Sequence, residues 1–180
     1  MSLNRTVALV GMMGAGKTSV GKRLAARLGV PFKDADHEIE TAAGLTVAEI
    51  FEKFGEPEFR DGERRVIARL LGDPPHILAT GGGAYMDPAT RAAMKARAFT
   101  IWLKAPVELL LARVAKRQTR PLLNNADPKG TLEKLLAQRE PTYAQADYVL
   151  ESVDGPHEKA VGQVLDILKA RGLLLQEAAP

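Results

Sequence analysis

Short apolar runs alternate along the chain with stretches whose apolar residues recur every three or four positions. Val20, Leu24 and Leu28, for example, fall on one face of a helix, which Gly29 ends. The expected strands are "TVALV" at 6–10, "PFKDAD" at 31–36, "HILAT" at 76–80, "FTIWL" at 99–103 and "YVL" at 148–150. This alternation predicts a single α/β domain, residues 1–180, with a parallel sheet flanked by helices.

Capping signals mark further helices. Thr46 and Glu49 have the spacing of a capping box, which predicts a helix running through Phe54. Asp87 and Pro88 suit the N-cap and first turn of another helix. The remaining expected helices run from Glu58 to Leu71, from near Pro106, from Leu132 to Tyr143 and from Glu158 to Ala170.

Two segments lack such periodicity. Residues 116–131 are rich in basic, Asn, Pro and Gly residues, which predicts a mobile loop. The tail from Leu173 to Pro180 is expected to fray.

Composition narrows the class of protein. The 180 residues include no cysteine, which excludes disulfides and thiolate metal sites. No apolar run approaches the ~20 residues of a membrane span, and the N-terminus does not resemble a signal peptide, so we expect a cytoplasmic protein without membrane contact. The net charge of +3 is mild, and no basic block or aromatic-interleaved basic stripe suggests nucleic acid.

The stretch "GMMGAGKT" at 11–18 carries the clearest chemistry. Gly11, Gly16, Lys17 and Thr18 match the P-loop pattern G-x-x-x-x-G-K-[ST] between a strand and a helix. In such a loop, backbone N–H groups of Gly14 to Ser19 surround phosphate oxygens, the lysine reaches the β and γ phosphates, and the Thr hydroxyl ligates Mg²⁺. No guanine-reading N-K-x-D follows, and the chain is short for a large ATPase, so a small P-loop kinase is favoured.

The second substrate of a kinase needs its own site. Asp34 and Asp36 end the second expected strand, where both carboxylates would project the same way and face the ligand crevice; the alternative is a polar turn with Asp36 capping a helix. Arg60 has Glu63 at i+3 to brace it, although a lone helical Arg is commonly a solvated charge.

Three consecutive glycines, 81–83, follow the strand at 76–80. They form either a tight turn or a place where a ligand closely approaches bare backbone. The two carboxylates could accept hydrogen bonds from hydroxyl groups, the arginine could bind an anion, and the bare amides would allow close approach. Together they indicate that the second substrate is a small polyhydroxylated acid.

Six segments, in order and spacing, resemble those of shikimate kinases over almost the whole chain. They are "GMMGAGKTSVGKRLA", "DADHEIE", "IFEKFGEPEFRDGE", "ATGGGA", "RPLL" and "QREPTYAQAD". The resemblance implies a P-loop nucleoside-monophosphate-kinase-like fold with a five-stranded parallel sheet, monomeric, with a lid at about 113–130 and an acceptor-binding region at about 34–62. It also implies transfer of the γ-phosphoryl group of ATP to the 3-hydroxyl of shikimate, in the chorismate pathway of aromatic amino acid biosynthesis, with Mg²⁺ as cofactor.

The resemblance also assigns residues. Asp36 would bind the shikimate hydroxyls, Arg60 and Arg139 its carboxylate, and Gly81, Gly82 and Gly83 would line the same pocket. Thr18 would ligate the metal directly and Asp34 through water, Arg120 would join Lys17 on the phosphates, and Arg113 would lie near the adenine. The walls of the acceptor pocket would be Phe51, Phe59, Pro121 and Leu122, residues that equally suit plain core packing.

Some roles stay open. The adenine loop of the family commonly has Thr or Ser and a basic or glycine residue before a proline, whereas this chain reads "ESVDGPHE" there. Either Asp34 or Asp36 could accept the hydroxyl proton. Another small-molecule kinase, such as a gluconate kinase, and a non-catalytic module that senses ATP and a ligand are the alternative functions.

Overall fold

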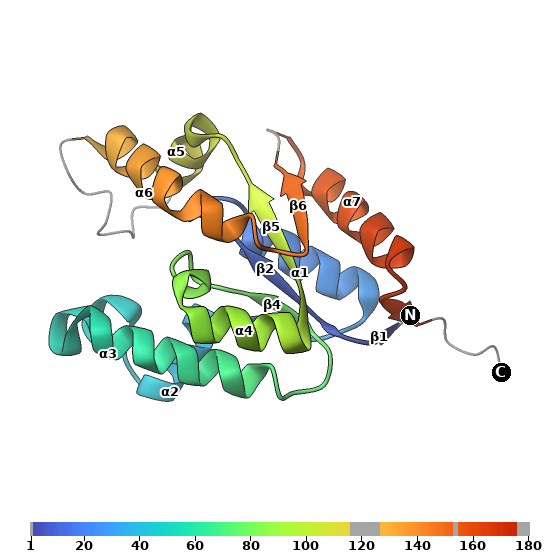
Figure 1. Cartoon of the computed structure of the whole chain (residues 1–180), viewed down its shortest axis with the longest axis horizontal. Helices are drawn as coiled ribbons and strands as arrows, with labels where there is room; N and C mark the ends of the chain where they lie inside the picture. Colours follow the sequence, from blue (N-terminus) through green and yellow to red (C-terminus); the bar gives the residue numbers. More distant parts are fainter. Residues whose placement is uncertain (1, 116–126, 153–154, 176–180) are drawn as a thin grey trace.

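A computed structural model of the protein describes residues 2–115, 127–152 and 155–175. The central sheet has five parallel strands in the order β3-β4-β2-β5-β6 (Figure 1). These are β2 (Thr6–Val10), β3 (Phe32–Asp34), β4 (Ile77–Ala79), β5 (Ala98–Lys104) and β6 (Tyr148–Glu151). Strands β2 and β4 are completely buried, which explains their continuous apolar sequences. The predicted parallel sheet is therefore confirmed.

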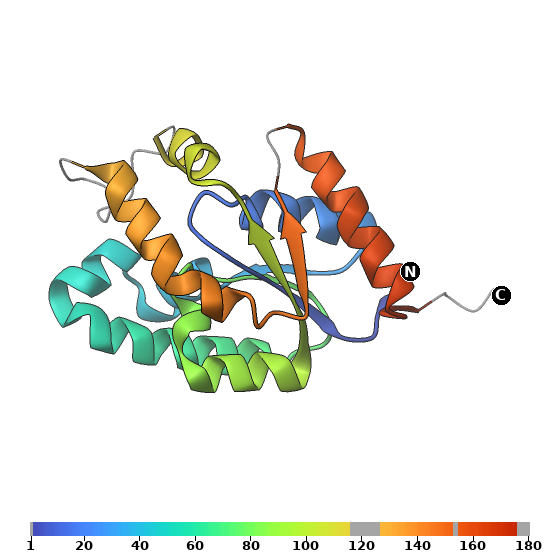
Figure 2. The ribbon, with the colours of Figure 1, turned by 45° about the horizontal axis from the view of Figure 1, so that its top comes forward.

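Helices cover both faces of the sheet (Figure 2). Helix α1 packs against α7 on one face, whereas α4 packs on β5 and against α3 on the other. The helices are α1 (Lys17–Leu28), α2 (Ala35–Ala43), α3 (Val47–Leu70), α4 (Pro88–Arg97), α5 (Val107–Ala115), α6 (Pro128–Tyr143) and α7 (His157–Ala170), with a 3₁₀ turn η1 (Ala84–Met86). None of the described helices is both long and apolar enough to cross a membrane.

The predicted capping residues of two helices are confirmed. Thr46 and Glu49 form the capping box of α3, with Thr46 Oγ1 accepting from the Glu49 amide at 3.2 Å. Asp87 caps α4 with Pro88 in its first turn. The two predicted helices at 46–54 and 58–71 are confirmed as the two helical segments of α3, which meet at a kink because Gly55 has the non-helical angles φ 80° and ψ 174°.

Three sequence expectations are wrong in part. The second strand ends at Asp34, and Asp36 lies in the first turn of α2, because the Asp34 carboxylate caps that helix by accepting from the Asp36 amide at 3.2 Å. The expected loop 116–131 overlaps α6, which begins at Pro128 with Asp127 as its cap. Residues 113–115 and 128–130 of the expected lid are therefore helical, and 116–126 lie outside the described residues.

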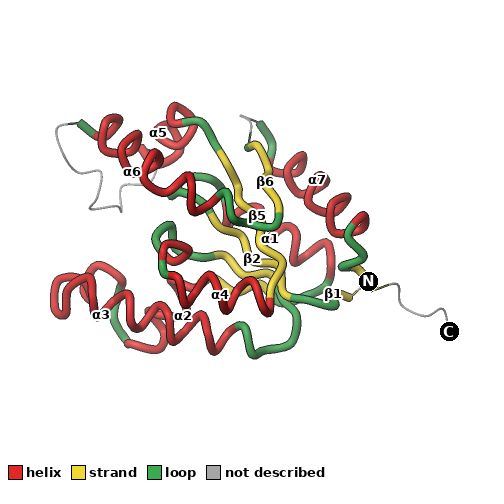
Figure 3. Tube along the Cα trace, viewed as in Figure 1, coloured by secondary structure: helices red, strands yellow, loops and turns green. Residues whose placement is uncertain are grey.

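The third correction concerns the tail. Within the predicted tail, β7 (Leu174–Leu175) pairs antiparallel with β1 (Ser2–Leu3) instead of fraying (Figure 3), and residues 176–180 lie outside the described residues.

Two apolar clusters of unequal size hold these layers. The large one surrounds the sheet, whereas a separate cluster of three buried residues, Ile39, Ile50 and Phe59, lies between α2 and α3.

Candidate active site

A cavity of about 330 Å³ opens at the carboxyl ends of the sheet strands, where parallel-sheet proteins bind ligands. P-loop residues line its middle, the β3–α2 and β4–η1 junctions line one end, and α5 and α7 line the other. The lining residues are Gly14, Gly16, Lys17, Thr18, Ser19, Asp34, Asp36, Thr80, Gly81, Gly82, Arg113, Val114 and His157. The structure thus brings together most of the predicted site.

The P-loop depends on its glycines. Gly11, Gly14 and Gly16 have φ of 136°, 79° and 97°, in the region that other residues rarely adopt. A methyl group on Gly11 would also lie 2.7 Å from the Leu103 carbonyl oxygen of the neighbouring strand. The loop therefore turns back tightly over β5 and begins α1 at Lys17, and the amino end of a helix is a position that favours an anion.

Lys17 is held against this loop. Its ammonium group donates to the carbonyl oxygens of Gly11 at 2.8 Å and Met12 at 2.9 Å, and the residue is only 9% exposed. These contacts fix a positive charge at the centre of the cavity, beside the helix N-terminus.

The Thr18 hydroxyl donates to Asp34 Oδ2 at 2.8 Å. A hydroxyl and a carboxylate oxygen in contact are hard ligands of the kind that suit Mg²⁺, which is usually held by one or two protein oxygens together with substrate phosphates. The described residues contain no cluster of three or more acidic or His side chains that could enclose a metal alone. The donor set therefore fits a magnesium ion shared with a nucleotide.

The glycine triplet lies against three of the predicted acceptor residues, Asp36, Arg60 and Arg139. A methyl group on Gly81 would lie 2.9 Å from both Asp36 Oδ1 and Glu63 Oε1, and one on Gly83 would lie 2.5 Å from Arg60 Nη2. A methyl group on Gly82 would lie 3.4 Å from Arg139 Nη1 and 3.5 Å from the Met13 amide of the P-loop. The bare backbone thus lets two arginines and two carboxylates converge beside the phosphate site.

Arg60 is braced from its own helix. It donates to Glu63 Oε2 at 2.8 Å and to Glu56 Oε1 at 3.3 Å. Burial disfavours the charge of Arg60, but both glutamates outweigh it, so the pKa of Arg60 is raised and it stays cationic.

Glu63 is 3% exposed, and its Oε1 has no hydrogen-bond partner within the described residues. Burial raises the pKa of Glu63 despite the neighbouring Arg60.

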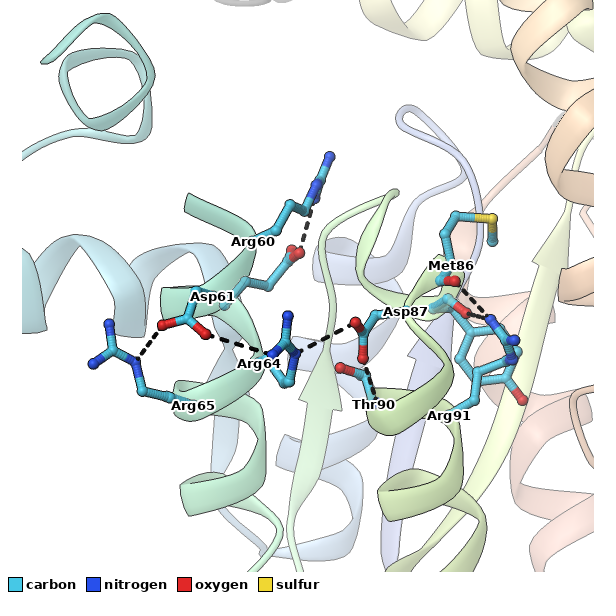
Figure 4. Close-up of polar contacts among 10 residues, drawn as sticks. Arg60, Asp61, Arg64, Arg65, Met86, Asp87, Thr90 and Arg91 are labelled. Atoms are coloured by element: carbon cyan, nitrogen blue, oxygen red, sulfur yellow. Dashed lines mark hydrogen bonds and ion pairs between the residues drawn. The ribbon is translucent and has the colours of Figure 1, made fainter. Parts of the chain in front are cut away.

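Helix α3 is also tied to the segment that follows the glycines (Figure 4). Arg64 Nε lies 3.3 Å from Asp87 Oδ2, and Arg91 Nη1 donates to the carbonyls of Tyr85 and Met86 at 2.8 Å each. The Arg64–Asp87 ion pair therefore joins α3 to the N-cap of α4, and Arg91 of α4 holds the carbonyls of η1.

Helix α6 contributes Arg139 and Tyr143, which contact the glycine triplet and the P-loop. The Tyr143 hydroxyl donates to the Gly82 carbonyl, and burial raises the pKa of Tyr143 to about 12, so the phenol stays protonated. Its ring stacks on Trp102 with centroids 5.6 Å apart. Arg139 Nη1 approaches Met12 Sδ at 3.9 Å, which places the guanidinium between the two glycine loops.

Neither Phe51 nor Phe59, the predicted aromatic wall of the acceptor pocket, is among the residues that line this cavity. Phe51 and Phe59 pack with ring centroids 4.6 Å apart, and the Arg60 guanidinium lies 5.2 Å from the Phe59 ring. Phe59 is buried in the α2–α3 cluster, whereas Phe51 is 36% exposed. Phe59 therefore also packs in the core, as its alternative role predicts.

At the far end of the cavity, Arg113 Nη1 lies 3.3 Å from the Ala15 carbonyl oxygen and 3.4 Å from Ser152 Oγ. It therefore lies beside the P-loop, on the side away from the glycine triplet. Arg120, Pro121 and Leu122 lie outside the described residues.

Sequence reasoning did not assign five contributors to this site. They are Thr80, Val114, Tyr143 and His157, together with Glu63, which it treated only as a brace for Arg60. The string "QREPTYAQAD" contains Tyr143, and its spacing of four from Arg139 places both on one helical face. No local signal links His157 to the P-loop, because that contact joins residues far apart in the chain.

Comparison with known proteins agrees with this geometry. Residues 13–169 match the family model for shikimate kinase. The chain is 54% identical to a shikimate kinase of Bradyrhizobium diazoefficiens over 98% of this chain and 85% of that protein, and 56% identical to one of Nitrobacter winogradskyi over 93% and 78%.

Solved structures give the same result. A shikimate kinase from Acinetobacter baumannii in complex with shikimate superposes with a TM-score of 0.90 at 40% identity, covering 94% of this chain and 96% of that one. A gluconokinase from Sinorhizobium meliloti reaches a TM-score of 0.66 at 18% identity over 96% and 95% of the two chains, a likeness in fold alone.

Proposed function

Because the chain belongs to the shikimate kinase family, we propose that it transfers the γ-phosphoryl group of ATP to the 3-hydroxyl of shikimate, giving shikimate 3-phosphate and ADP. One observation supports this best. Arg60, Arg139 and Asp36 converge on the bare backbone of the glycine triplet, at the acceptor end of a P-loop cavity. This set matches a small acid that also carries hydroxyl groups.

In this proposal, Arg60 and Arg139 bind the shikimate carboxylate from opposite sides. Planar guanidinium groups pair with a carboxylate through two parallel hydrogen bonds, and burial strengthens such pairs. The Asp36 carboxylate accepts from the ring hydroxyls, and the glycines allow the ring to lie against the main chain. The acceptor hydroxyl then faces the P-loop.

Transfer breaks the bond between the γ-phosphorus and its bridging oxygen and forms one to the 3-hydroxyl oxygen. Because the transition state is loose, positioning and charge stabilisation dominate over base strength. Lys17 lies where charge develops on the phosphate oxygens, and Arg120 would add a second positive charge. The hydroxyl proton passes to Asp36, which accepts from the ring hydroxyls in this proposal, whereas Asp34 would hold Mg²⁺ together with Thr18.

Thr18 and Asp34 would hold Mg²⁺ together with the nucleotide. When bound, the ion neutralises charge on the β and γ phosphates. A monomer in the cytoplasm stays a prediction from the sequence.

A coupled assay of ADP release tests the proposal. We expect turnover with shikimate and almost none with gluconate or without an acceptor. Turnover with gluconate but not shikimate would favour the gluconate kinase alternative. Binding of both ligands without ADP release would favour a sensing module.

A further inference from the structure

The carbonyl groups of the glycine triplet differ in what holds them. The Gly81 and Gly83 carbonyls accept from backbone amides of η1, at 3.2 and 3.0 Å. The Gly82 carbonyl accepts instead from the Tyr143 hydroxyl, which comes from α6, 61 residues further along the chain. We infer that Tyr143 is a positioning residue for phosphoryl transfer, which holds the glycine triplet against the P-loop through this hydrogen bond. The inference rests on the proposed kinase function.

Gly82 lies where the two glycine-rich loops meet. A methyl group on it would be 3.5 Å from the Met13 amide and 3.7 Å from the Gly11 carbonyl oxygen, both in the P-loop. Glycine restricts its own backbone very little, so the Gly82 peptide group needs an outside contact to keep one orientation. Any change there alters the spacing between the acceptor end and the phosphate end of the cavity. Phosphoryl transfer depends on that spacing, because a displacement of about 1 Å can lower a rate by about 100-fold.

The Tyr143 side chain is itself firmly placed. It is 0% exposed, and its ring stacks on Trp102 with an angle of 26° between the ring planes. Its hydroxyl also lies 3.7 Å from Met12 Sδ of the P-loop. Tyr143 is not among the residues that line the cavity, so it acts on bound reactants through the groups that it holds.

The same hydrogen bond sets the distance between α6 and the glycine triplet. Arg139 precedes Tyr143 by one helical turn, and its Nη1 would be 3.4 Å from a methyl group on Gly82. The carboxylate-binding arginine and the bare backbone therefore share one support. Because burial raises the pKa of Tyr143 to about 12, its hydroxyl remains a hydrogen-bond donor throughout the neutral pH range.

The test compares Tyr143→Phe with Tyr85→Phe. Phenylalanine at 143 keeps the ring that stacks on Trp102 and removes only the donor. Tyr85 is the matched control, because it is also buried, its hydroxyl contacts Thr100, and neither of these two residues lines the cavity. With saturating ATP and shikimate, kcat should fall by about 10-fold or more in Tyr143→Phe and stay within about twofold in Tyr85→Phe. The ADP affinity, measured by calorimetry, should stay within about twofold in both variants.

A second readout does not depend on turnover. The carbonyl carbon resonance of Gly82 reports the hydrogen bond that this carbonyl accepts, so it should shift in Tyr143→Phe and stay in place in Tyr85→Phe. An unmoved Gly82 resonance in Tyr143→Phe, or a kcat within about twofold of wild type, would overturn the inference.

Two further outcomes would also overturn it. An equal loss of kcat in Tyr85→Phe would mean that any buried phenol has this effect. A loss of ADP affinity in Tyr143→Phe as large as the loss of kcat would mean that the hydroxyl supports nucleotide binding rather than the spacing of the two loops. Absence of shikimate phosphorylation by the wild type would refute the proposed function, and the Gly82 resonance would then decide whether Tyr143 holds the triplet.

Discussion

At the scale of single residues, Lys17 combines a structural and a chemical role. Its two hydrogen bonds to loop carbonyls orient the ammonium group before any nucleotide binds. We expect Lys17→Met to fold, with a modest loss of stability from these two contacts. Its kcat should fall by about 30- to 1000-fold, equivalent to ~2–4 kcal/mol of transition-state stabilisation. Circular dichroism and the ADP-release assay together check this, and near-normal turnover in a folded variant would contradict it.

The two arginines of the acceptor pocket differ in the side chains that hold them in place. Arg60 is fixed by Glu63 and Glu56, whereas Arg139 lies beside Met12 Sδ and the Tyr143 hydroxyl. Lysine at either position keeps the charge but loses the planar pair of donors. Each single Arg→Lys change should weaken shikimate binding by ~1.5–3 kcal/mol and leave ADP binding nearly unchanged.

An amide analogue of shikimate provides the control for that prediction. Replacing the carboxylate by a neutral amide should weaken binding strongly in the wild type and much less in an Arg60→Ala, Arg139→Ala double variant. Equal discrimination between acid and amide by the two proteins would mean that these arginines do not bind the carboxylate.

At the scale of elements, the β4–η1 junction sets where Arg60 points. Gly83 has φ −90°, so alanine is allowed by the backbone, but its methyl group would lie 2.5–2.7 Å from the Arg60 guanidinium. Since the obstructed group is the end of a flexible side chain, we expect Gly83→Ala to move Arg60 rather than unfold the protein. Shikimate affinity should fall about tenfold, and the free energy of unfolding should change by under ~1 kcal/mol.

Gly62→Ala is the matched control on the helix that carries Arg60. Nothing lies within 4 Å of a methyl group there. Alanine should stabilise the helix interior by ~0.5–1 kcal/mol and leave shikimate affinity unchanged. Titrations of both variants followed by chemical denaturation separate the two effects, and wild-type affinity in Gly83→Ala would show that the junction does not control Arg60.

These elements also show what the sequence could and could not predict. The P-loop was predictable because its glycines adopt backbone conformations that other residues rarely take, and the glycine triplet was predictable because three residues without side chains indicate the close approach of other groups. The cap at Asp34 was not, because both aspartates in "DAD" have a side chain that can cap a helix. The pairing of Leu174 with Leu3 joins the two ends of the chain, so no local periodicity could indicate it.

At the scale of the whole molecule, a buried histidine makes stability depend on pH. His76 directly precedes β4, at the end of the sheet opposite to the active site, and its side chain is 0% exposed. Its Nδ1 lies 2.9 Å from the Pro74 carbonyl, which assigns the proton of the neutral ring to Nδ1, and its Nε2 has no partner within the described residues. Protonating Nε2 would bury an unsatisfied charged donor, so burial lowers the pKa of His76 below 6.5.

The sign of the effect follows directly. Below about pH 6.5 the unfolded chain takes up a proton at this histidine, while the folded protein does not until its lower pKa is reached. The contribution of His76 to stability is therefore lost as pH falls from about 6.5 through the folded pKa. As pH falls through that window, the free energy of unfolding of wild type should decrease more than that of His76→Leu. The comparison uses this change with pH, so a constant difference in stability between the two proteins at pH 7.5 does not affect it. Parallel slopes for the two proteins would contradict this role, and the exposed His37→Ala variant should behave as wild type.

Trp102 is the single tryptophan of the chain and is 3% exposed. Its Cδ1 would lie 3.2 Å from a methyl group on Gly11, and its ring stacks on Tyr143, whose hydroxyl holds the carbonyl of Gly82. One chromophore therefore contacts the phosphate loop directly and the acceptor loop through one intermediate. The protein contains its own optical reporter, and the intensity of Trp102 emission should respond to ADP and to shikimate added separately, without any label.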